Sequence, residues 1–174
     1  PANNDAQYNI GIGYWALLSI TDGDNNTVLG NLAGTNMTTT SDTVIIGVTA
    51  GDAINSADAD GTVAIGRNAL TALTDGQYNV AIGKSALGAN KQNDHNTAVG
   101  YNALAAMSGS SAGSTNNTAL GSWAGYRVTT GVSNTLLGQY AGQAITTANY
   151  NNFVGVQSGH KTTTGGYNVS IGME

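Results

Sequence analysis

The stretch NTAVGYNAL, residues 96–104, recurs in near copies along the whole chain of 174 residues. The copies can be aligned on the glycine of this stretch, and ten such anchor glycines occur. They are Gly13, Gly30, Gly47, Gly66, Gly83, Gly100, Gly121, Gly138, Gly155 and Gly172. Seven of the nine intervals between anchors are 17 residues long, and the other two are 19 and 21. A fixed period with two small insertions is typical of a repeat protein.

Three columns of this alignment have a constant chemical character. The residue three after the anchor is alanine in eight copies and Ser158 in the ninth, so we expect that only a small side chain fits there. The residue four before the anchor is Asn in eight copies and Thr in two, at Thr43 and Thr62. The residue directly before the anchor is aliphatic in every copy, and we predict that this column forms the core. It consists of Ile12, Leu29, Ile46, Ile65, Ile82, Val99, Leu120, Leu137, Val154 and Ile171.

Each copy begins with a short run such as YNVAI, residues 78–82, which is rich in β-branched and aromatic residues and is bounded by turn residues. Such runs predict short strands, and no stretch shows the 3.6-residue period of a helix. The sequence therefore predicts an all-β fold, a parallel β-solenoid of about ten 17-residue coils that forms one repeat domain over residues 1–174. A coil of this length has room for two short strands and two turns. The two insertions, within 51–60 and 105–115, fall in the same link and predict long loops along one edge.

Side chains alternate between the two faces of a strand. The residue two before the anchor therefore points away from the predicted core, yet this column is also apolar in most copies. A strand that is apolar on both faces is normally buried on both. We expect a partner subunit to cover this second face. Its residues are Val28, Ile45, Ala64, Ala81, Ala98, Ala119, Leu136 and Phe153.

Identical residues in register form ladders along such a stack. We predict that the Asn column links its side-chain amides from coil to coil, and that the anchor glycines permit a positive φ at the bend. The predicted structural ladder consists of Asn9, Asn26, Asn79, Asn96, Asn117, Asn134, Asn151 and Asn168, with Gly30, Gly66, Gly83, Gly100, Gly121, Gly138 and Gly155.

Composition and charge argue against several classes of function. The net charge is −5 and the five basic residues are scattered singly, so we expect no nucleic-acid partner. The absence of cysteine excludes disulfides, zinc–thiolate sites and cysteine nucleophiles. No apolar run is long enough to cross a membrane, so we expect no membrane insertion in this segment. The chain begins at Pro1 without Met and stops as a tenth copy begins, which we interpret as a fragment of a longer fibre or adhesin.

Neither catalytic nor metal-binding patterns are convincing, and we expect neither an enzyme nor a cofactor. His95 and His160 are the only histidines, and no hydrolase triad or metal site is evident around them. The pairs Asp22/Asp24 and Asp58/Asp60 alternate as in calcium loops, but such a loop usually ends in a Glu and the only Glu is Glu174. Turn-forming Asp is therefore the favoured interpretation.

The repeats resemble those of two groups of surface fibres. YNVAIGKSAL (78–87), GTVAIGRNAL (61–70) and YNVSIG (167–172) resemble the head repeat of trimeric autotransporter adhesins, and NTAVGYNAL (96–104) and SNTLLGQYAG (133–142) resemble repeats of phage tail fibres. The resemblance implies a left-handed β-roll packed as a homotrimer, in a virion fibre or at an extracellular cell surface. It implies a non-enzymatic structural and attachment segment that binds a host-surface receptor. The adhesin repeat is shorter than 17 residues, so the coil shape is expected to differ.

Three aromatic residues, Trp15, Trp123 and Tyr140, stand two after an anchor, where we expect them to face outward. They are candidate receptor contacts, stacking on sugars or anchoring a protein, or else they cover the seam between subunits. An alternative function is a monomeric ice-binding or carbohydrate-binding solenoid. Ice binding is favoured by Thr pairs such as Thr146/Thr147 that stack in register. A carbohydrate-active enzyme is disfavoured because no carboxylate cluster is present.

Overall fold

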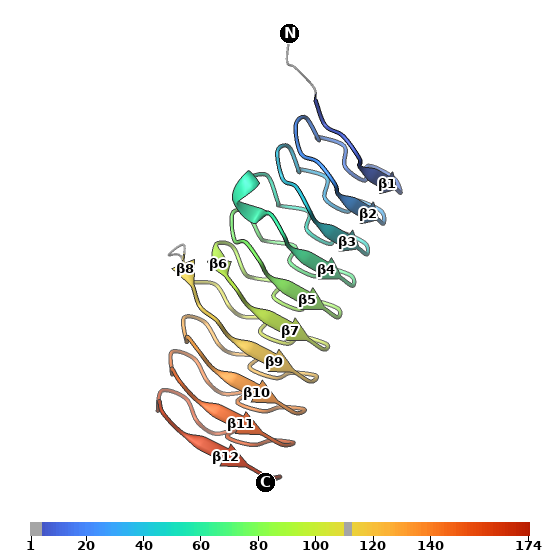
Figure 1. Ribbon diagram of the computed structural model, residues 1–174. Helices are drawn as coiled ribbons and strands as arrows, with labels where there is room; N and C mark the ends of the chain where they lie inside the picture. The colour runs from blue at the N-terminus through green and yellow to red at the C-terminus, as the bar shows by residue number, and fades with distance from the viewer. Residues whose placement is uncertain (1–4, 110–112) are drawn as a thin grey trace.

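The chain folds into a β-solenoid, which a computed structural model describes over residues 5–109 and 113–174. Each repeat adds one three-residue strand to a single parallel sheet of ten strands (Figure 1). The strands, in spatial order, are β1 (Ile10–Ile12), β2 (Thr27–Leu29), β3 (Val44–Ile46), β4 (Val63–Ile65), β5 (Val80–Ile82), β7 (Thr97–Val99), β9 (Thr118–Leu120), β10 (Thr135–Leu137), β11 (Asn152–Val154) and β12 (Val169–Ile171). Ten strands joined in nine steps make about nine turns, which confirms the all-β parallel solenoid.

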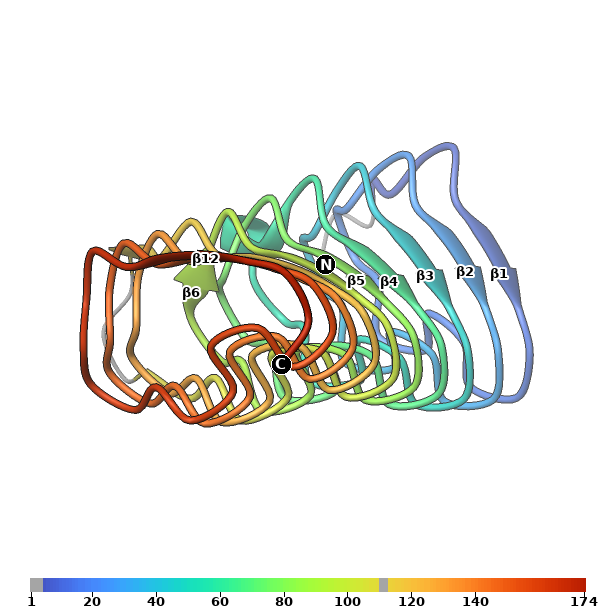
Figure 2. The ribbon, with the colours of Figure 1, turned by 90° about the horizontal axis from the view of Figure 1, so that it is seen from below.

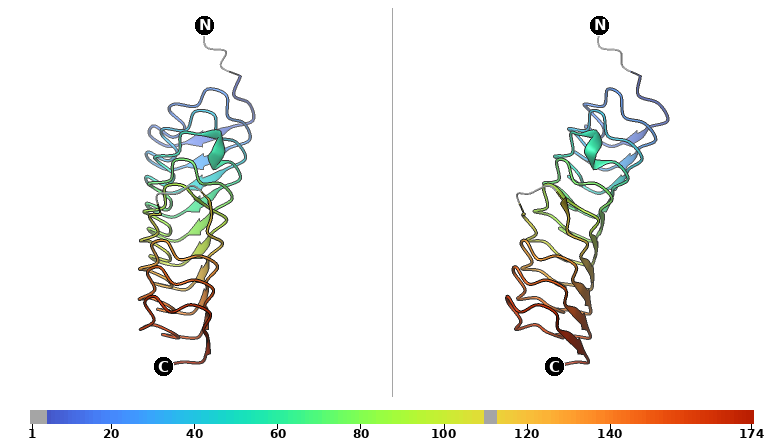
Figure 3. Two further views of the ribbon diagram at one scale, coloured as in Figure 1. Left: turned by 90° about the vertical axis from the view of Figure 1, so that its left-hand side faces the viewer. Right: turned by 60° about the vertical axis from the view of Figure 1, so that its left-hand side comes forward.

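Equivalent residues of successive repeats stand directly above one another. Ala81 on β5 pairs with Ala64 on β4 and with Ala98 on β7, and the same register holds along the whole sheet. With strands about 4.8 Å apart, nine steps extend the sheet by roughly 43 Å. The termini accordingly lie at opposite ends of an elongated molecule (Figures 1 and 3). Seen nearly end-on, the coils are flattened loops that stack with a gradual lateral drift (Figure 2).

The leg that follows each anchor is a run of turns and contains no second strand of comparable length. In the copy of Gly100, φ is positive at the anchor, at Asn102 and again at Leu104, with values of 135°, 55° and 50°. Alternating φ signs make successive N–H groups point in opposite directions along the stack. Asn102 donates to the carbonyl of Lys84 in the previous coil, and Leu104 donates to that of Ala124 in the next.

Most coils therefore contain one strand, although 17 residues have room for two. Among the described residues, a second ladder forms only between β6 (Asn93–Asp94) and β8 (Gly113–Ser114). The loop 51–60 carries a short 3-10 helix, η1 (Ala57–Ala59), in which the Ser56 hydroxyl accepts the N–H of Asp58. The other predicted loop, 105–115, includes residues 110–112, which lie outside the described residues.

The residue two before the anchor fills the inside of the coil, and the residue directly before it lies outside. All of the former column from Val28 to Phe153 is at most 1% exposed. In the latter column Leu29, Ile82 and Leu120 are 45%, 37% and 52% exposed.

The predicted core and the predicted partner-covered face were thus assigned to the wrong sides. Alternation shows which residues share a face, but it does not show which face the chain curls around when both are apolar. Placed outside are Ile12, Leu29, Ile46, Ile65, Ile82, Val99, Leu120, Leu137, Val154 and Ile171. Placed inside are Val28, Ile45, Ala64, Ala81, Ala98, Ala119, Leu136 and Phe153.

The opposite wall of the coil supplies the rest of the core. The alanine column three after the anchor is fully buried from Ala33 to Ala141. A further column seven after the anchor contributes larger side chains. Its buried members are Met37, Ile54, Leu73, Asn90, Met107, Val128 and Ile145.

Side-chain size is matched across the interior of each coil. Where the residue two before the anchor is large, the residue four after it is glycine, as in Val28/Gly34, Ile45/Gly51, Leu136/Gly142 and Phe153/Gly159. Where the former is alanine, the latter is leucine, as in Ala64/Leu70, Ala81/Leu87 and Ala98/Leu104. A Cβ placed on Gly159 would lie 2.3 Å from the Phe153 ring. In the coil of Ala119 and Gly125, where both are small, Leu104 and Leu136 fill the space from the neighbouring coils.

This matching predicts a compensating pair of substitutions at Ile45 and Gly51. Gly51→Leu should destabilise the fold by about 1–3 kcal/mol through overpacking, and Ile45→Ala by about 2–5 kcal/mol through a cavity. The double variant recreates the Ala/Leu pairing of the next three coils, and its loss should be well below the sum. Urea unfolding of the four proteins measures the coupling. Strictly additive losses would show that the two positions do not share one space.

Candidate functional site: the outer face of the sheet

The asparagine column four before the anchor forms hydrogen-bonded ladders in two runs, from Asn9 to Thr43 and from Asn79 to Asn168, just before the strands. The side-chain Oδ1 of Asn117 accepts both the backbone N–H and the side-chain amide of Asn134, each at 3.0 Å. The amide of Asn117 in turn donates to the carbonyl of Gly131 at 2.8 Å. The same pattern links Asn134 to Asn151 and Asn151 to Asn168. Each amide therefore satisfies buried backbone groups in the next coil, which is a structural role.

The ladder is interrupted where threonine replaces asparagine. The Thr43 hydroxyl donates a hydrogen bond to Oδ1 of Asn26 at 2.7 Å. The buried hydroxyl of Thr62 has no hydrogen-bond partner. A threonine side chain is too short to span the distance that an amide spans. The stack is held at this step by backbone hydrogen bonds and core packing.

We predict that Thr62→Asn stabilises the protein by about 1 kcal/mol, because its amide would join Asn79 to the ladder. Conversely, Asn117→Ala should cost about 1–3 kcal/mol, because it leaves buried groups of Asn134 and Gly131 unpaired. Thermal or urea unfolding measures both changes. Asn31→Ala, at an exposed position, is the control and should be nearly neutral. A destabilising Thr62→Asn would mean that the step at Thr62 cannot accept an amide.

The anchor glycines form a second column that no other residue can replace. Their φ values lie between 129° and 144° in all ten copies. A Cβ on Gly100 would lie 2.5 Å from the carbonyl oxygen of Gly121 in the next coil. Positive φ and close stacking thus both require glycine at the end of each strand.

The outer face of the sheet presents a continuous band of aliphatic side chains, which we call the aliphatic stripe. It consists of the residue directly before each anchor, from Ile12 on β1 to Ile171 on β12, at one side chain per coil. The neighbouring outward column, three before the anchor, holds Ile, Val, Thr and one Asn. None of the ten strands of this sheet carries a charged residue. The stripe is therefore apolar, uncharged and repeated at the spacing of the coils.

The predicted receptor contacts lie beside the stripe, at the bend that follows the strands. Trp15 is 50% exposed and stacks on Tyr14 with ring centroids 4.7 Å apart. Trp123 is half-buried, and its ring makes edge contacts with Tyr101 at 5.4 Å and Tyr126 at 4.5 Å. Tyr140 occupies the equivalent, half-buried place in the following coil.

Trp15, Trp123 and Tyr140 all have a positive φ, between 58° and 63°. Bulky residues seldom adopt this conformation, and the other copies place Asn, Ser, Thr, Gln or, at Leu32, leucine there. Trp123, which forms a cluster with Tyr101 and Tyr126, is thus one of several bulky residues that hold this strained conformation; we call the three rings the Trp123 cluster. Strained positions of this kind are where a function is sought first.

One carboxylate of each acidic pair accepts a backbone N–H of the preceding coil. Asp24 Oδ1 accepts the backbone N–H of Gln7 at 2.6 Å, and Asp60 Oδ1 accepts that of Ser41 at 2.7 Å. Over residues 5–109 and 113–174, no group of three or more His, Cys, Asp and Glu side chains is positioned to hold a metal ion. The chemistry of Asp24 and Asp60 is thus accounted for by backbone hydrogen bonds.

The two histidines have separate environments. His95 lies over the ring of Tyr78, with centroids 5.3 Å apart, and its Nδ1 contacts the Ser114 hydroxyl at 3.1 Å. His160 contacts the carboxylate of Glu174. The hydrogen bond from Lys161 lowers the pKa of the exposed Glu174 carboxyl, and the charge of nearby His160 adds to this effect.

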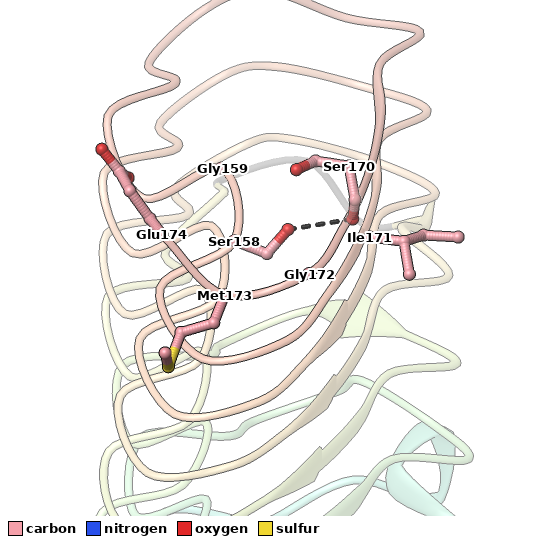
Figure 4. Close-up of a pocket in the computed structure, with 7 residues that line it drawn as sticks. All are labelled: Ser158, Gly159, Ser170, Ile171, Gly172, Met173 and Glu174. Atoms are coloured by element: carbon pink, nitrogen blue, oxygen red, sulfur yellow. Dashed lines mark hydrogen bonds between the residues drawn. The ribbon is translucent and has the colours of Figure 1, made fainter.

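A cavity of about 290 Å³ opens at the C-terminal face of the last coil (Figure 4). Ser158 and Ser170 line it, and the Ser158 hydroxyl donates to the Ser170 carbonyl at 2.9 Å. Glu174 is the one ionisable residue of its lining. This lining contains no acid–base pair and no activated nucleophile.

Threonine side chains eight residues after the anchor form hydrogen bonds between successive coils. The hydroxyls of Thr21, Thr129 and Thr146 donate to the carbonyls of the next coil at 3.1–3.3 Å. Each of these hydroxyls has used its one donor and keeps its acceptor lone pairs.

Comparison with known proteins finds no matching family model, no similar curated protein and no similar solved structure. The likeness to adhesin heads and tail fibres therefore stays a prediction from the repeat motif. In the part of the chain that the structure describes, no helix is long and apolar enough to cross a membrane.

Sequence reasoning missed the outward orientation of the aliphatic stripe. The sequence does contain a signal for the orientation of the two columns, which is the variation of side-chain size. The column directly before the anchor keeps Val, Leu or Ile in every copy, whereas the column two before it changes size together with the residue four after the anchor. Paired changes in size indicate contact inside a packed core, and this pairing identifies the inner face.

Proposed function

We propose that this chain is a non-enzymatic structural and attachment segment of a homotrimeric fibre, either a viral tail fibre or a surface adhesin. The observation that carries the proposal is the aliphatic stripe, an uncharged apolar band along the whole outer face of the sheet. In the proposed fibre the stripe of each chain faces the common axis. The trimer face is thus the column of Ile65 and Ile82, and not the buried column of Ala64 and Ala81 that the sequence favoured.

The size of the stripe supports this assignment. The largest apolar patch on a typical monomer covers about 300–600 Å², and a standard interface buries about 800 Å² on each partner. Ten aliphatic side chains, with the outward Val and Ile residues beside them, form a band that runs the roughly 43 Å length of the sheet. A face of this extent is costly to leave in water.

The number of chains and the hand of the coil come from the resemblance to trimeric fibre repeats. Three chains with their stripes facing one axis would bury the aliphatic side chain of every coil to the same extent. The location that follows from this proposal is a virion fibre or an extracellular cell surface. Nucleic acid has no part in it.

The attachment role is supported by the Trp123 cluster, where Tyr101, Trp123 and Tyr126 gather half-exposed at the bend. Exposed aromatic rings with neighbouring polar side chains are suited to stack on sugar rings or to anchor a protein. We propose this cluster, with Trp15 and Tyr140 in equivalent places, as the receptor contact. Part of it borders the stripe and would also cover the seam between chains.

The proposal predicts the mass of the protein in solution. Light scattering coupled to size exclusion should give a mass near three times 17.5 kDa. Ile65→Lys together with Ile82→Lys should convert the trimer to a folded monomer, because each lysine would bury a charge at the interface. Thr147→Lys, exposed and outside the stripe, is the control and should leave the mass unchanged. A monodisperse monomer of the unmodified protein would contradict the proposal.

The receptor contact is tested by binding of the labelled protein to a printed glycan array. Trp123→Ala should lower binding to any glycan that the protein recognises by about tenfold, since stacking on an aromatic ring is worth on the order of 1 kcal/mol or more. The trimer mass should be unchanged. Leu18→Ala, an exposed apolar residue outside the cluster, is the control. Loss of the trimer in Trp123→Ala would instead assign the cluster to the seam.

A further inference from the structure

The two sides of the aliphatic stripe carry opposite charges. Arg67 and Lys84 directly follow the anchors of β4 and β5, and we call this side the basic flank. In the first nine copies neither of the two positions after the anchor holds an acidic residue. On the other side, five or six residues before an anchor, stand Asp24, Asp42, Asp60 and Asp94, with no Lys or Arg in those positions in any copy. We call this side the acidic flank.

These charges form no ion pair with another described residue of the chain. Over residues 5–109 and 113–174, the ion pairs are those of Glu174 with His160 and Lys161. The exposed Lys84 ammonium lies 5.7 Å from the centre of the Tyr101 ring, which keeps it on its own flank. Asp60 and Asp94 each use one carboxylate oxygen, Oδ1, to accept a backbone N–H. The flanks can therefore form ion pairs with another molecule without breaking any ion pair of the fold.

A second copy of this chain is the partner that matches the surface between the flanks. The stripe offers one aliphatic side chain per coil at a spacing of about 4.8 Å over ten coils. A surface with the same period and the same length is found on another copy. No residue in the strands of the ten-stranded sheet is charged, so copies can meet on this face without stacking like charges.

The direction of association follows from the flanks. When copies run parallel around a common axis with their stripes inward, the basic flank of each copy faces the acidic flank of the next. When two copies run antiparallel with their stripes face to face, like flanks meet and repel. Exposed charges contribute little affinity but discriminate between orientations.

A closed ring of copies around one axis fixes the axial register, because no copy can be shifted in the same direction against both of its neighbours. Arg67 and Asp60 belong to the same repeat, and Lys84 belongs to the repeat between those of Asp60 and Asp94. In that register Arg67 meets Asp60 at its own height, and Lys84 lies one coil, about 4.8 Å along the axis, from Asp60 and from Asp94.

We propose that copies of this chain associate in parallel and in register, with Arg67 and Lys84 of one copy against Asp60 and Asp94 of the next. This arrangement rests on the proposed function, since it uses the aliphatic stripe as the interface. It adds that opposite charges on the two flanks set the direction of the fibre. The aliphatic stripe supplies the affinity.

Disulfide cross-linking tests the arrangement directly, because the chain has no cysteine of its own. Tyr78 and Lys84 are exposed, belong to the same repeat and lie on opposite flanks. Proteins carrying Tyr78→Cys and Lys84→Cys are mixed, dissociated and reassociated, then oxidised. The expected product is a disulfide between the two variants, with neither variant cross-linking to itself.

The matched control replaces Lys84→Cys with Gln139→Cys, which lies on the same flank three coils away, at a distance of roughly 14 Å along the axis. It should not cross-link to Tyr78→Cys. Self-linking of Lys84→Cys would mean that like flanks meet, and preferential linking of Tyr78→Cys to Gln139→Cys would mean a shifted register. Either result overturns the arrangement while leaving the oligomer intact. A protein that stays monomeric by light scattering overturns the proposed function and this arrangement together.

Charge reversal gives a second readout. Arg67→Glu with Lys84→Glu should raise the protein concentration at half-association by about tenfold at low salt, and the difference should shrink as salt is added. Lys91→Glu with Arg127→Glu makes the same change in net charge at exposed positions off the flanks, and it should have a much smaller effect. Equal effects of the two double variants would show that net charge alone governs association, and would overturn the proposal.

Discussion

The close stacking of identical backbone turns is the constraint on which the rest of the structure depends. Each strand ends at a glycine with positive φ, and a Cβ at Gly100 would meet the next anchor's carbonyl at 2.5 Å. Every residue of the repeat is consequently stacked on its own equivalent in the next coil. The same residue can recur in successive coils only when its side chain can pack against an identical side chain. Asparagine does so as both donor and acceptor, and alanine does so because it is small.

The same constraint explains the unusual composition of the chain. Charged residues make up 9% of the sequence, and a column of one charge would place like charges about 4.8 Å apart. Charged residues accordingly occur in few coils of any column, as with Arg67 and Lys84. Bulk is limited in a similar way inside the coil, where Ile45 requires Gly51 opposite it and Ala81 requires Leu87. The outer face has no such limit, and its aliphatic column is uniform.

Much of the fold could be predicted from the sequence because the period is explicit. Anchor spacing located the ten strands, and the Asn column indicated the ladder that links Asn117 to Asn134. The side of the sheet that faces inward could not be predicted from alternation, because Ala81 and Ile82 are both apolar and only the curl of the chain distinguishes them. The turn-rich leg was missed because residues with positive φ such as Leu104 and Trp123 carry no turn signature. A role for the charges beside the stripe could not be predicted from the sequence, because it depends on the outward orientation of the stripe.

The central claim is that copies of the chain meet through the outer face of the sheet. Electron paramagnetic resonance with a nitroxide on Thr135→Cys, beside the stripe on β10, tests it most directly. The account predicts a single short distance between nitroxides of different copies, and no such signal from a nitroxide on Thr147→Cys at the far edge. An associated protein in which the Thr135 nitroxides show no mutual dipolar coupling would place the interface elsewhere and contradict the account.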